Sequence, residues 1–479
     1  MLRGISTGGS CTRRRFMQWA GAAGLTLALP NGTWARERAA RRPNVILCMT
    51  DDQGWGDTGY NGHPVLKTPH LDAMARDGIR FNRFYSGAPV CSPTRGSSLT
   101  GRHPYRYGIV FANRGHMKPQ EITLAEVLKG HGYTTGHFGK WHLGTLTKDI
   151  KDGRRGGRQN EHFAPPWENG FDECFCTEQA VPTWDPMKNQ PFETKYWTGP
   201  GQYAKDNLDG DDSRVIMDRA VPFIRQAVAA KKPFFVVIWF HTPHEKVIAG
   251  PQYRAMYPDQ DENHQHYYGC ITAMDEQVGR LRAELKTLGA ADDTMLWFCS
   301  DNGPAGKGGG TKQIPGARQQ GSSGPFRGRK GSLYEGGVRV PGMLVWPRAV
   351  KKPRTTDVPC VTSDYFPTVL DVLGHRLPEA RRRPYDGVSL VPLIEGRMTQ
   401  RNQPIGFESG KQLSFVTDQY KLYSSNAGKT FELYDLIADP SEKNDIAASH
   451  KEIVASLKSK LMTWRASCRA SNKGADYNG

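Results

Sequence analysis

Four short runs of apolar residues punctuate the chain, and polar or turn-forming residues bound each of them. The runs are NVILCMT, PFFVVIWF, TMLWFCS and GMLVWP, and they begin at positions 44, 233, 294 and 342. They are rich in β-branched and aromatic residues and show no alternation between polar and apolar positions. This pattern predicts β-strands that are buried on both faces, as in a parallel sheet.

Between these runs the apolar spacing changes to that of amphipathic helices. Helices are predicted for TPHLDAMARDG, TLAEVLKGHG and SDYFPTVLDVLG, and for a long segment over about 264–289. A further strand, YTTGHFGKWHLG, runs from Tyr133 into a loop. Strands that alternate with helices predict an α/β fold with a mostly parallel, mixed sheet and helices on both of its faces.

The pattern changes again near residue 400. LSFVTDQYKLYSS and KTFELYDL have the features of antiparallel strands joined by tight turns, and HKEIVASLKSKLMTWRASC those of a closing amphipathic helix. We therefore predict a large domain over residues 43–400 and a smaller C-terminal α+β domain with an antiparallel sheet over residues 401–479.

The first 35 residues have the composition of an export signal. Arg13, Arg14 and Arg15 precede an apolar run that is too short to span a bilayer, and the segment ends in small residues that allow cleavage after Ala35. The paired arginines predict a twin-arginine signal read by the twin-arginine translocase. The sequence thus predicts export to the periplasm or beyond, a bacterial source and no stable membrane insertion.

The chain carries a formal net charge of +16, of which the predicted signal supplies four charges. A basic surface favours acidic partners such as nucleic acid or acidic polysaccharide. No run of Lys and Arg is interleaved with aromatic residues, so nucleic acid is not the expected partner. Nine cysteines are present, and their spacing leaves open whether any disulfide forms.

Three of the predicted strands end in residues that bind metals or move protons. Asp51 and Asp52 follow the first strand, His241 and His244 the second, and Asp301 and Asn302 the third. Alone, the Asp and Asn pairs are more typical of caps and turns, and a lone histidine is more often structural. Together they predict one site, because sites in α/β sheets lie beyond the carboxyl ends of the strands.

The residue types at these strand ends indicate a hard cation. Three carboxylates and one amide oxygen suit Ca²⁺, with Mg²⁺ as the second choice, and are poor ligands for zinc. Several cations and proton carriers would complete a pocket for an anionic ester. These are Arg95, Lys140, His142, His244 and Lys330.

The stretch CSPTRGSSLTGR, residues 91–102, has two interpretations. Ser92 fits a helix N-cap, Pro93 the first helical position and Gly101 the end of the helix. Cys91 would then lie just before a helix N-terminus, either as a buried structural thiol or as a nucleophile in an anion site. A thiol is a poor ligand for a hard cation, so the second interpretation requires an oxygen at position 91.

The motif C-S-P-T-R closely resembles the C-x-P-x-R maturation motif of type I sulfatases, which belong to the alkaline phosphatase superfamily. NVILCMTDDQGWGDTGYNG, GKWHLG, SDNG, LYEGGVR and ELYDLIADPSEKNDIA resemble other family segments in the same order, from about residue 43 to about residue 445. The segments DDQGWGDTGYNG and SDNGP resemble those of arylsulfatases and N-acetylgalactosamine-6-sulfatases. The resemblance implies an alkaline phosphatase-like fold and a Cys91 that the formylglycine-generating enzyme oxidises to formylglycine (3-oxoalanine).

The resemblance also implies a role for each candidate residue. Asp51, Asp52, Asp301, Asn302 and modified Cys91 would bind one divalent ion. A hydroxyl of hydrated formylglycine would attack the ester sulfur, with Arg95 and Lys140 stabilising its anionic form. His244 and Lys330 would hold the sulfate, and one of them would protonate the leaving alcohol. His142 would then take a proton so that sulfate is expelled. In HTPHEK, the family's use of H-x-P-H favours His244 over His241 for binding the sulfate and leaves His241 as support.

The expected function is hydrolysis of a sulfated carbohydrate or an aryl sulfate. A phosphate or phosphonate ester hydrolase of the same superfamily and a non-catalytic binder of sulfated glycans are the alternatives. The sugar, the position of its sulfate and the choice between endo and exo action depend on loops 145–205 and 303–330. Trp184, Tyr196 and Trp197 lie in the first of these loops, either to stack on sugar rings or to anchor the loop. The oligomeric state is also open.

Overall fold

The computed structural model describes residues 42–154, 161–188, 190, 192–306 and 320–477. The predicted twin-arginine signal at 1–35 lies outside the described residues, as do positions 307–319 of the predicted loop 303–330. Among the residues that the structure describes, no helix combines the length and apolar character needed to cross a membrane.

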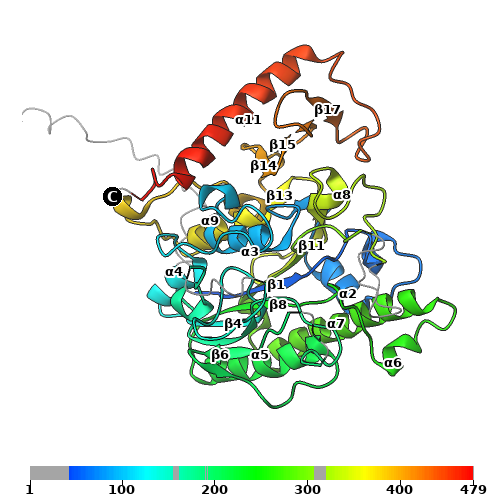
Figure 1. The fold of residues 1–479 in the computed structure, drawn as a ribbon, viewed down its shortest axis with the longest axis vertical. Coiled ribbons are helices and arrows are strands. Elements are labelled where there is room, and N and C mark those ends of the chain that lie inside the picture. Colours follow the sequence, from blue (N-terminus) through cyan, green and yellow to red (C-terminus); the bar gives the residue numbers. More distant parts are fainter. Residues whose placement is uncertain (1–41, 155–160, 189, 191, 307–319, 478–479) are drawn as a thin grey trace, which may run out of the picture.

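A ten-stranded mixed sheet forms the centre of the described chain (Figure 1). Strand β1 (Asn44–Thr50) lies between β8 (Phe234–Trp239) and β9 (Thr294–Ser300) and is parallel to both. The parallel part continues through β4 (Thr134–Lys140) and β5 (Glu173–Thr177). The edges are formed by β11 (Gly342–Val345), β2 (Ile79–Phe81) and β12 (Arg354–Thr356) on one side, and by β6 (Trp197–Gly199) and β7 (Gln202–Tyr203) on the other. The predicted α/β fold with a mostly parallel sheet is confirmed.

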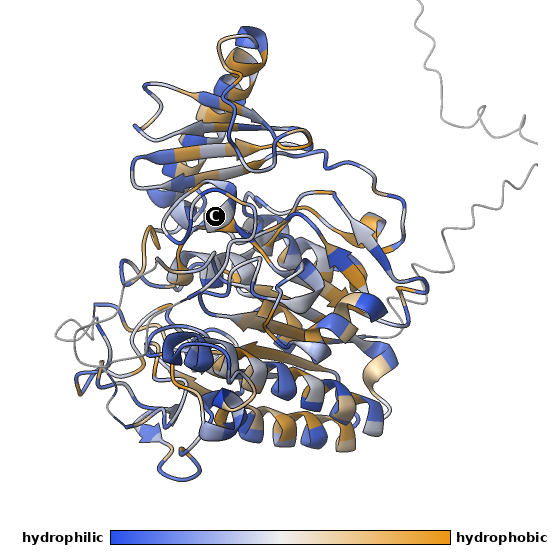
Figure 2. Ribbon diagram, turned by 90° about the vertical axis from the view of Figure 1, so that its right-hand side faces the viewer, coloured by the Kyte–Doolittle hydropathy of each residue, from blue (hydrophilic) through white to orange (hydrophobic). Residues whose placement is uncertain are grey.

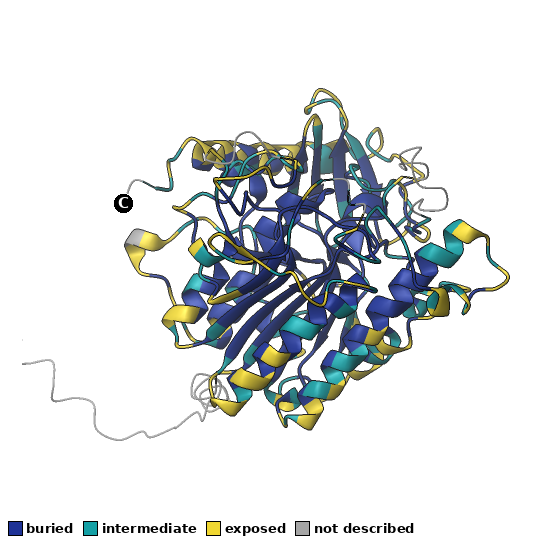
Figure 3. Ribbon diagram, turned by 60° about the horizontal axis from the view of Figure 1, so that its bottom comes forward, coloured by how far each residue is buried: buried dark blue, intermediate teal, exposed yellow. Residues whose placement is uncertain are grey.

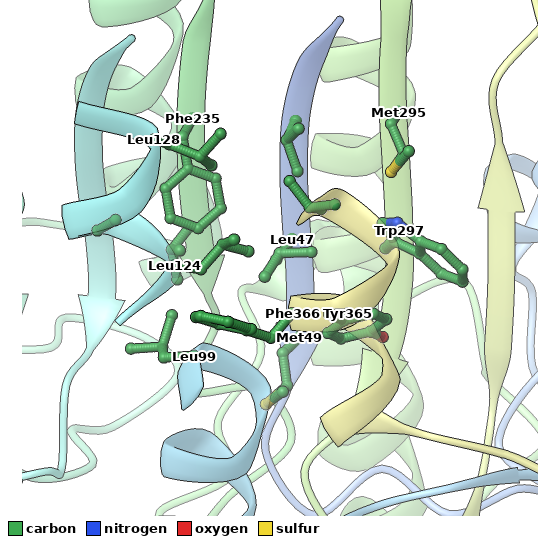
Figure 4. Close-up of a cluster of buried hydrophobic side chains, with 14 of the residues drawn as sticks. Leu47, Met49, Leu99, Leu124, Leu128, Phe235, Met295, Trp297, Tyr365 and Phe366 are labelled. Atoms are coloured by element: carbon green, nitrogen blue, oxygen red, sulfur yellow. The ribbon is translucent and has the colours of Figure 1, made fainter. Parts of the chain in front are cut away.

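Helices cover both faces of this sheet, and the alternation of side chains along β1 shows how. Val45, Leu47 and Met49 pack into one core cluster, whereas Ile46 and Cys48 pack into the other. The first cluster lies under α3 (Cys91–Thr100), α4 (Leu124–Gly130) and α9 (Tyr365–Val372) (Figure 4). The second lies against α5 (Asp212–Ala229) and α7 (Glu262–Thr287), whose outer faces are exposed (Figure 3). Burial on both faces explains why the strands are apolar throughout.

The C-terminal part is a four-stranded antiparallel sheet covered by one helix. Its strands are β14 (Ile405–Ser409), β15 (Gln412–Val416), β16 (Tyr420–Ser424) and β17 (Glu432–Asp435), and the helix is α11 (Lys451–Asn472). One face of the sheet packs on α11, and the other packs on the large domain (Figures 1 and 2). This confirms the smaller antiparallel α+β part.

Shorter elements complete the described chain. A three-stranded sheet contains β10 (Arg339–Val340), β3 (Phe84–Tyr85) and β13 (Cys360–Val361). The remaining α-helices are α2 (Pro69–Asp77), α6 (Pro251–Arg254), α8 (Glu335–Val338) and α10 (Val391–Ile394). The eight cysteines of the described residues are all buried free thiols, so no disulfide links these parts.

The expected start of helix α3 is wrong. The helix begins at Cys91 with Val90 as its cap residue, not at Pro93 with Ser92 as the cap. The hydroxyl of Thr94 makes the local bonds instead, since it accepts from the amide of Ala88 at 3.1 Å and donates to the Ala88 carbonyl at 2.9 Å. Cys91 is therefore the first residue of the helix. The predicted end is confirmed, because Gly101 adopts a left-handed conformation at φ 69°.

Replacing Lys421 with methionine is expected to destabilise the junction between the two parts of the fold. The Nζ atom of this fully buried lysine lies 3.1 Å from Oε1 of Glu335 in the large domain and 2.9 Å from Oε1 of Glu442. The substitution removes the shared cation from two buried carboxyls, of which Glu335 retains Arg339 at 3.4 Å, and such a loss costs about 3–5 kcal/mol. Denaturant unfolding measures this, with the exposed Lys411→Met as the control. A loss under 1 kcal/mol for Lys421→Met would contradict the prediction.

His137 on β4 is expected to make the fold sensitive to acid. Its fully buried ring lies among Trp141, Phe171 and Trp239, with centroid distances of 5.0–5.3 Å. Burial, and then the charge of Arg95, hold the pKa of His137 well below its usual value. In the unfolded chain His137 is protonated as the pH falls below about 6.5, whereas in the folded chain it stays neutral. The free energy of unfolding therefore decreases as the pH drops below about 6.5.

His137→Phe removes this proton linkage. The variant should gain stability over the wild type by up to about 1.4 kcal/mol for each pH unit below about 6.5. Thermal unfolding between pH 4.5 and 7.5 measures the difference, with the exposed His70→Phe as the control. A difference that stays constant across this range would show that His137 does not cause the acid sensitivity.

Candidate active site

The carboxyl ends of four parallel strands bring the predicted residues to one edge of the sheet. Asp51 and Asp52 follow β1, Asp301 and Asn302 follow β9, and Lys140 ends β4. His241 and His244 follow β8. Helix α3 presents Cys91 and Arg95 to the same edge, and residues 320–334 bring in Lys330. The strand-end argument from the sequence thus places distant segments correctly.

Hydrogen bonds join the residues after β1 to those after β9, about 250 positions apart in the sequence. The amide nitrogen of Asp52 lies 3.1 Å from Oδ1 of Asp301, and Nδ2 of Asn302 donates to Oδ1 of Asp52 at 2.7 Å. Asp52 has a φ of 67°, a left-handed conformation that is unusual for a residue other than glycine. Strained backbone of this kind is common at functional sites.

Three cations surround these carboxylates. Nη2 of Arg95 lies 2.6 Å from Oδ2 of Asp301 and 3.4 Å from Oδ2 of Asp51. Nζ of Lys140 lies 2.6 Å from Oδ2 of Asp51, and Nζ of Lys330 lies 2.6 Å from Oδ1 of Asp52. The side chains of Arg95 and Lys140 are almost completely buried, whereas that of Lys330 is 22 % exposed. A substrate would therefore approach from the side of Lys330.

The charges of the site shift its pKa values in opposite directions. Burial opposes ionisation of Asp51 and Asp52, but the surrounding positive charges together outweigh it and lower the pKa of both. Lys140 is the largest of these charges at Asp51 and Lys330 at Asp52. Burial and the charge of Asp51 raise the pKa of Asp301 to about 7. Burial also raises the pKa of the Cys91 thiol. A divalent cation between the carboxylates would relieve the repulsion at Asp301.

The residues of this cluster fit a hard cation. Oδ1 of Asp51 and Oδ1 of Asn302 are buried and have no hydrogen-bond partner among the described residues. Buried oxygens are rarely left unpaired, so they mark a place for a cation or its water. Ligand atoms of Asp51, Cys91 and Asp301 lie within 4.8 Å of one another. The oxygen donors suit Ca²⁺ or Mg²⁺, and the sulfur atom of Cys91 stands where the resemblance places an oxygen.

The two histidines after β8 have different surroundings. Nδ1 of His241 lies 2.8 Å from Oδ2 of Asp212, and its Nε2 lies 2.8 Å from Oγ1 of Thr177, so both ring nitrogens are engaged in a buried position. Nδ1 of His244 faces the carbonyl of Glu245, which leaves Nε2 on the side of the cluster, 3.8 Å from Asp52. Burial lowers the pKa of His244 to about 4. This geometry supports His244 as the residue that meets substrate.

His142 is held by two amide side chains that the sequence did not indicate. Its Nε2 lies 2.7 Å from Oδ1 of Asn113 and 3.0 Å from Nε2 of Gln179, and Gln179 also donates to Asn113. His142 has a φ of 58°, again in the left-handed region. Asn113 and Gln179 lie in loops with no recognisable motif, so only the folded chain reveals them.

The aromatic residues of the loop 145–205 serve mainly as anchors. Tyr196 is fully buried and stacks on Phe175 with a centroid distance of 4.1 Å. Trp197 is 2 % exposed, and its indole nitrogen donates to Asp152 at 3.0 Å. Neither ring is available to stack on a sugar. Trp184 packs close to Gly250, where its ring would lie 2.4 Å from an added Cβ.

Buried carboxylates, three cations and histidines beside one cysteine are suited to hydrolysing esters of a tetrahedral oxyanion. The chain belongs to the sulfatase family and is a sulfuric ester hydrolase: the family model "Sulfatase" matches residues 43–375. The model of the C-terminal region of N-sulphoglucosamine sulphohydrolase matches residues 324–467.

Curated relatives and solved structures agree with this assignment. The chain is 33 % identical to N-acetylgalactosamine-6-sulfatase of Sus scrofa over 415 residues, which cover 80 % of this chain and 72 % of that protein. It is 30 % identical to arylsulfatase G of Rattus norvegicus, with coverage of 82 % and 77 %. The structure of Ps i-CgsB in complex with k-i-k-neocarrahexaose superposes with a TM-score of 0.76 at 25 % identity and covers 91 % of this chain and 97 % of that chain.

Proposed function

We propose that this protein removes sulfate from a sulfated carbohydrate by means of formylglycine at position 91 and one bound Ca²⁺ ion. The observation that carries the proposal is the placement of Cys91, within C-S-P-T-R, at the start of α3 and beside Asp51 and Asp301. The sulfated sugars in the names of its relatives and the formal charge of +16 support an acidic polysaccharide as the substrate class.

One group of residues would hold the metal ion, and a second group would act on the sulfate ester. Asp51, Asp52, Asp301 and Asn302 would hold the cation, which supplies a positive charge that stabilises an oxyanion at position 91. Hydrated formylglycine would supply a hydroxyl that attacks the ester sulfur. Arg95 and Lys140 reach the acidic residues from the interior and stabilise negative charge at that hydroxyl.

The remaining residues lie on the substrate side. Lys330 and His244 are the more exposed members of the cluster and would bind the sulfate, with one of them protonating the leaving alcohol. His142, oriented by Asn113, would accept the proton whose removal allows sulfate to leave. His241 supports this arrangement through its bonds to Thr177 and Asp212.

The same proposal includes maturation and export. Cys91 would be oxidised by the formylglycine-generating enzyme, and the segment 1–35 would direct the chain through the twin-arginine translocase to the periplasm or the exterior of a bacterium. Both steps require partners that recognise sequence motifs, C-S-P-T-R in the first case and the paired Arg13 and Arg14 in the second.

Sulfate release by the matured protein tests the proposal. The protein would be produced together with the formylglycine-generating enzyme, and mass spectrometry would confirm the aldehyde at position 91. Inorganic sulfate would be measured with an aryl sulfate and a panel of sulfated glycans, and phosphate with the matching aryl phosphate. Preferential release of sulfate supports the proposal, and the best glycan defines the substrate class. Faster hydrolysis of the phosphate ester would identify a phosphoryl hydrolase, and no release from any substrate would leave glycan binding.

A further inference from the structure

The backbone that carries Lys330 is fixed by three separate segments of the chain. The amide of Lys330 donates to the carbonyl of Pro304 at 3.0 Å, two residues beyond Asn302. The amide of Gly331 donates to the carbonyl of Pro89 at 2.8 Å, two residues before Cys91. These two bonds tie the lysine to the segments that carry the metal pocket and the modified residue.

The third anchor comes from the C-terminal sheet. Gln412, the first residue of β15, donates from Nε2 to the carbonyl of Gly331 at 2.7 Å. Its Oε1 accepts from the amide of Leu333 at 2.9 Å and from the hydroxyl of Tyr423 at 3.2 Å. Both ends of one amide side chain are therefore bonded to the backbone that immediately follows Lys330. Glutamine is suited to this contact because it combines a donor and an acceptor on one rigid group.

Lys330 depends on such support more than its neighbours do. Arg95 and Lys140 are almost completely buried, whereas Lys330 is partly exposed and reaches the site from an irregular segment. Its side chain is long and flexible, so its ammonium group is placed by its backbone and by the ion pair with Asp52. A displacement of about 1 Å in a group that positions substrate can cost about 10²-fold in rate.

We propose that Gln412 is a positioning residue for Lys330, so that the C-terminal sheet completes the sulfate-binding side of the active site. This inference rests on the proposed function, in which Lys330 binds the sulfate. The C-terminal sheet is also attached through Lys421, Glu335 and Glu442, and loss of the Gln412 contacts would therefore leave the two parts of the fold joined.

Two variants of Gln412 separate its contacts. Gln412→Met keeps the size of the side chain and removes its hydrogen bonds. Gln412→Glu keeps an acceptor for Leu333 and Tyr423 but turns a carboxylate oxygen toward the carbonyl of Gly331. Both should lower kcat/KM for the best substrate by about 10-fold to 10²-fold and weaken inhibition by inorganic sulfate. Gln419→Met is the control, since Gln419 is exposed in the turn between β15 and β16 and its side chain donates to Asp435, away from Lys330.

A double-mutant cycle with Lys330→Met tests whether Gln412 affects kcat/KM through Lys330. If Gln412 acts through Lys330, then Gln412→Met should change kcat/KM less than twofold once Lys330 has been replaced. Independent, multiplying effects of the two substitutions would overturn the inference and leave the proposed function intact. Wild-type kcat/KM in Lys330→Met would instead refute the role of Lys330 in the proposed function. If Gln412→Met unfolds, the same cycle is run with Gln412→Glu.

Discussion

Replacing Cys91 with serine is expected to abolish sulfate release. The loss in kcat should be about 10³-fold or more, as is typical when an enzyme loses its nucleophile. Serine cannot be converted to the aldehyde by the route that oxidises cysteine. Serine has one hydroxyl, whereas hydrated formylglycine has two. A sulfate ester formed on serine therefore could not release sulfate by elimination. The wild type and the variant would be produced together with the formylglycine-generating enzyme and compared on the best glycan and on an aryl sulfate.

Cys270→Ser is the matched control for this experiment. Cys270 is also a fully buried free thiol, but it lies in α7 on the opposite face of the sheet from α3. It should retain activity close to that of the wild type. Full activity in Cys91→Ser would mean that a plain hydroxyl or another residue performs the chemistry, and the proposed role of formylglycine would then be wrong.

Removing divalent cations is expected to have the second large effect. Treatment with a chelator should abolish sulfate release, and added Ca²⁺ should restore it, because the carboxylates of Asp51, Asp52 and Asp301 and the amide oxygen of Asn302 would lose the cation that they are proposed to hold. The same ion should raise the melting temperature, since a ligand at 100 times its Kd stabilises the folded state by about 2.7 kcal/mol. Parallel additions of Mg²⁺ and Zn²⁺ test the preference for a hard cation.

Asp301→Asn tests whether this cation occupies the predicted pocket. The substitution conserves shape, yet it replaces the carboxylate that faces Arg95, and that is proposed to bind the ion, with a neutral amide of weaker affinity for a hard cation. It should eliminate both the activity and the stabilisation by Ca²⁺. Asp275→Asn is the control. Asp275 is a buried carboxylate away from the site, where it accepts hydrogen bonds from the backbone amides of His70 and Leu71, so the response to Ca²⁺ should persist. An unchanged Ca²⁺ response in Asp301→Asn would contradict the proposed pocket.

The strands and their polar ends were predictable because each depends on a local pattern. An uninterrupted apolar run such as residues 44–50 identifies a strand buried on both faces, and the residues after it must then lie at the edge of the sheet. Helix α5 was not predicted, and Pro222 inside it interrupts the local helical pattern. The start of α3 was placed two residues too late, because the bonds of Thr94 to Ala88 overrode the capping preference of Ser92.

The parts of the site that escaped prediction are contacts between distant segments. Asn113 and Gln179 meet His142 only in the folded chain, and neither belongs to a recognisable motif. Gln412 lies 81 positions from Gly331, which it bonds. The choice of His244 over His241 rested on the resemblance to the sulfatase motif, whereas the structure adds a physical reason, since Thr177 and Asp212 already engage both nitrogens of His241.

The order of strands in the central sheet determines how early the sheet can close during synthesis of the chain. Strand β1 pairs with β8 and β9, whose residues are synthesised about 190 and 250 positions later. Such distant pairing is slow to form, and the helices over β1 cannot be enclosed until those strands have arrived. In the folded protein Cys91 is only 2 % exposed. An enzyme that modifies this thiol would therefore have to reach it during the interval between the synthesis of α3 and the closure of the sheet.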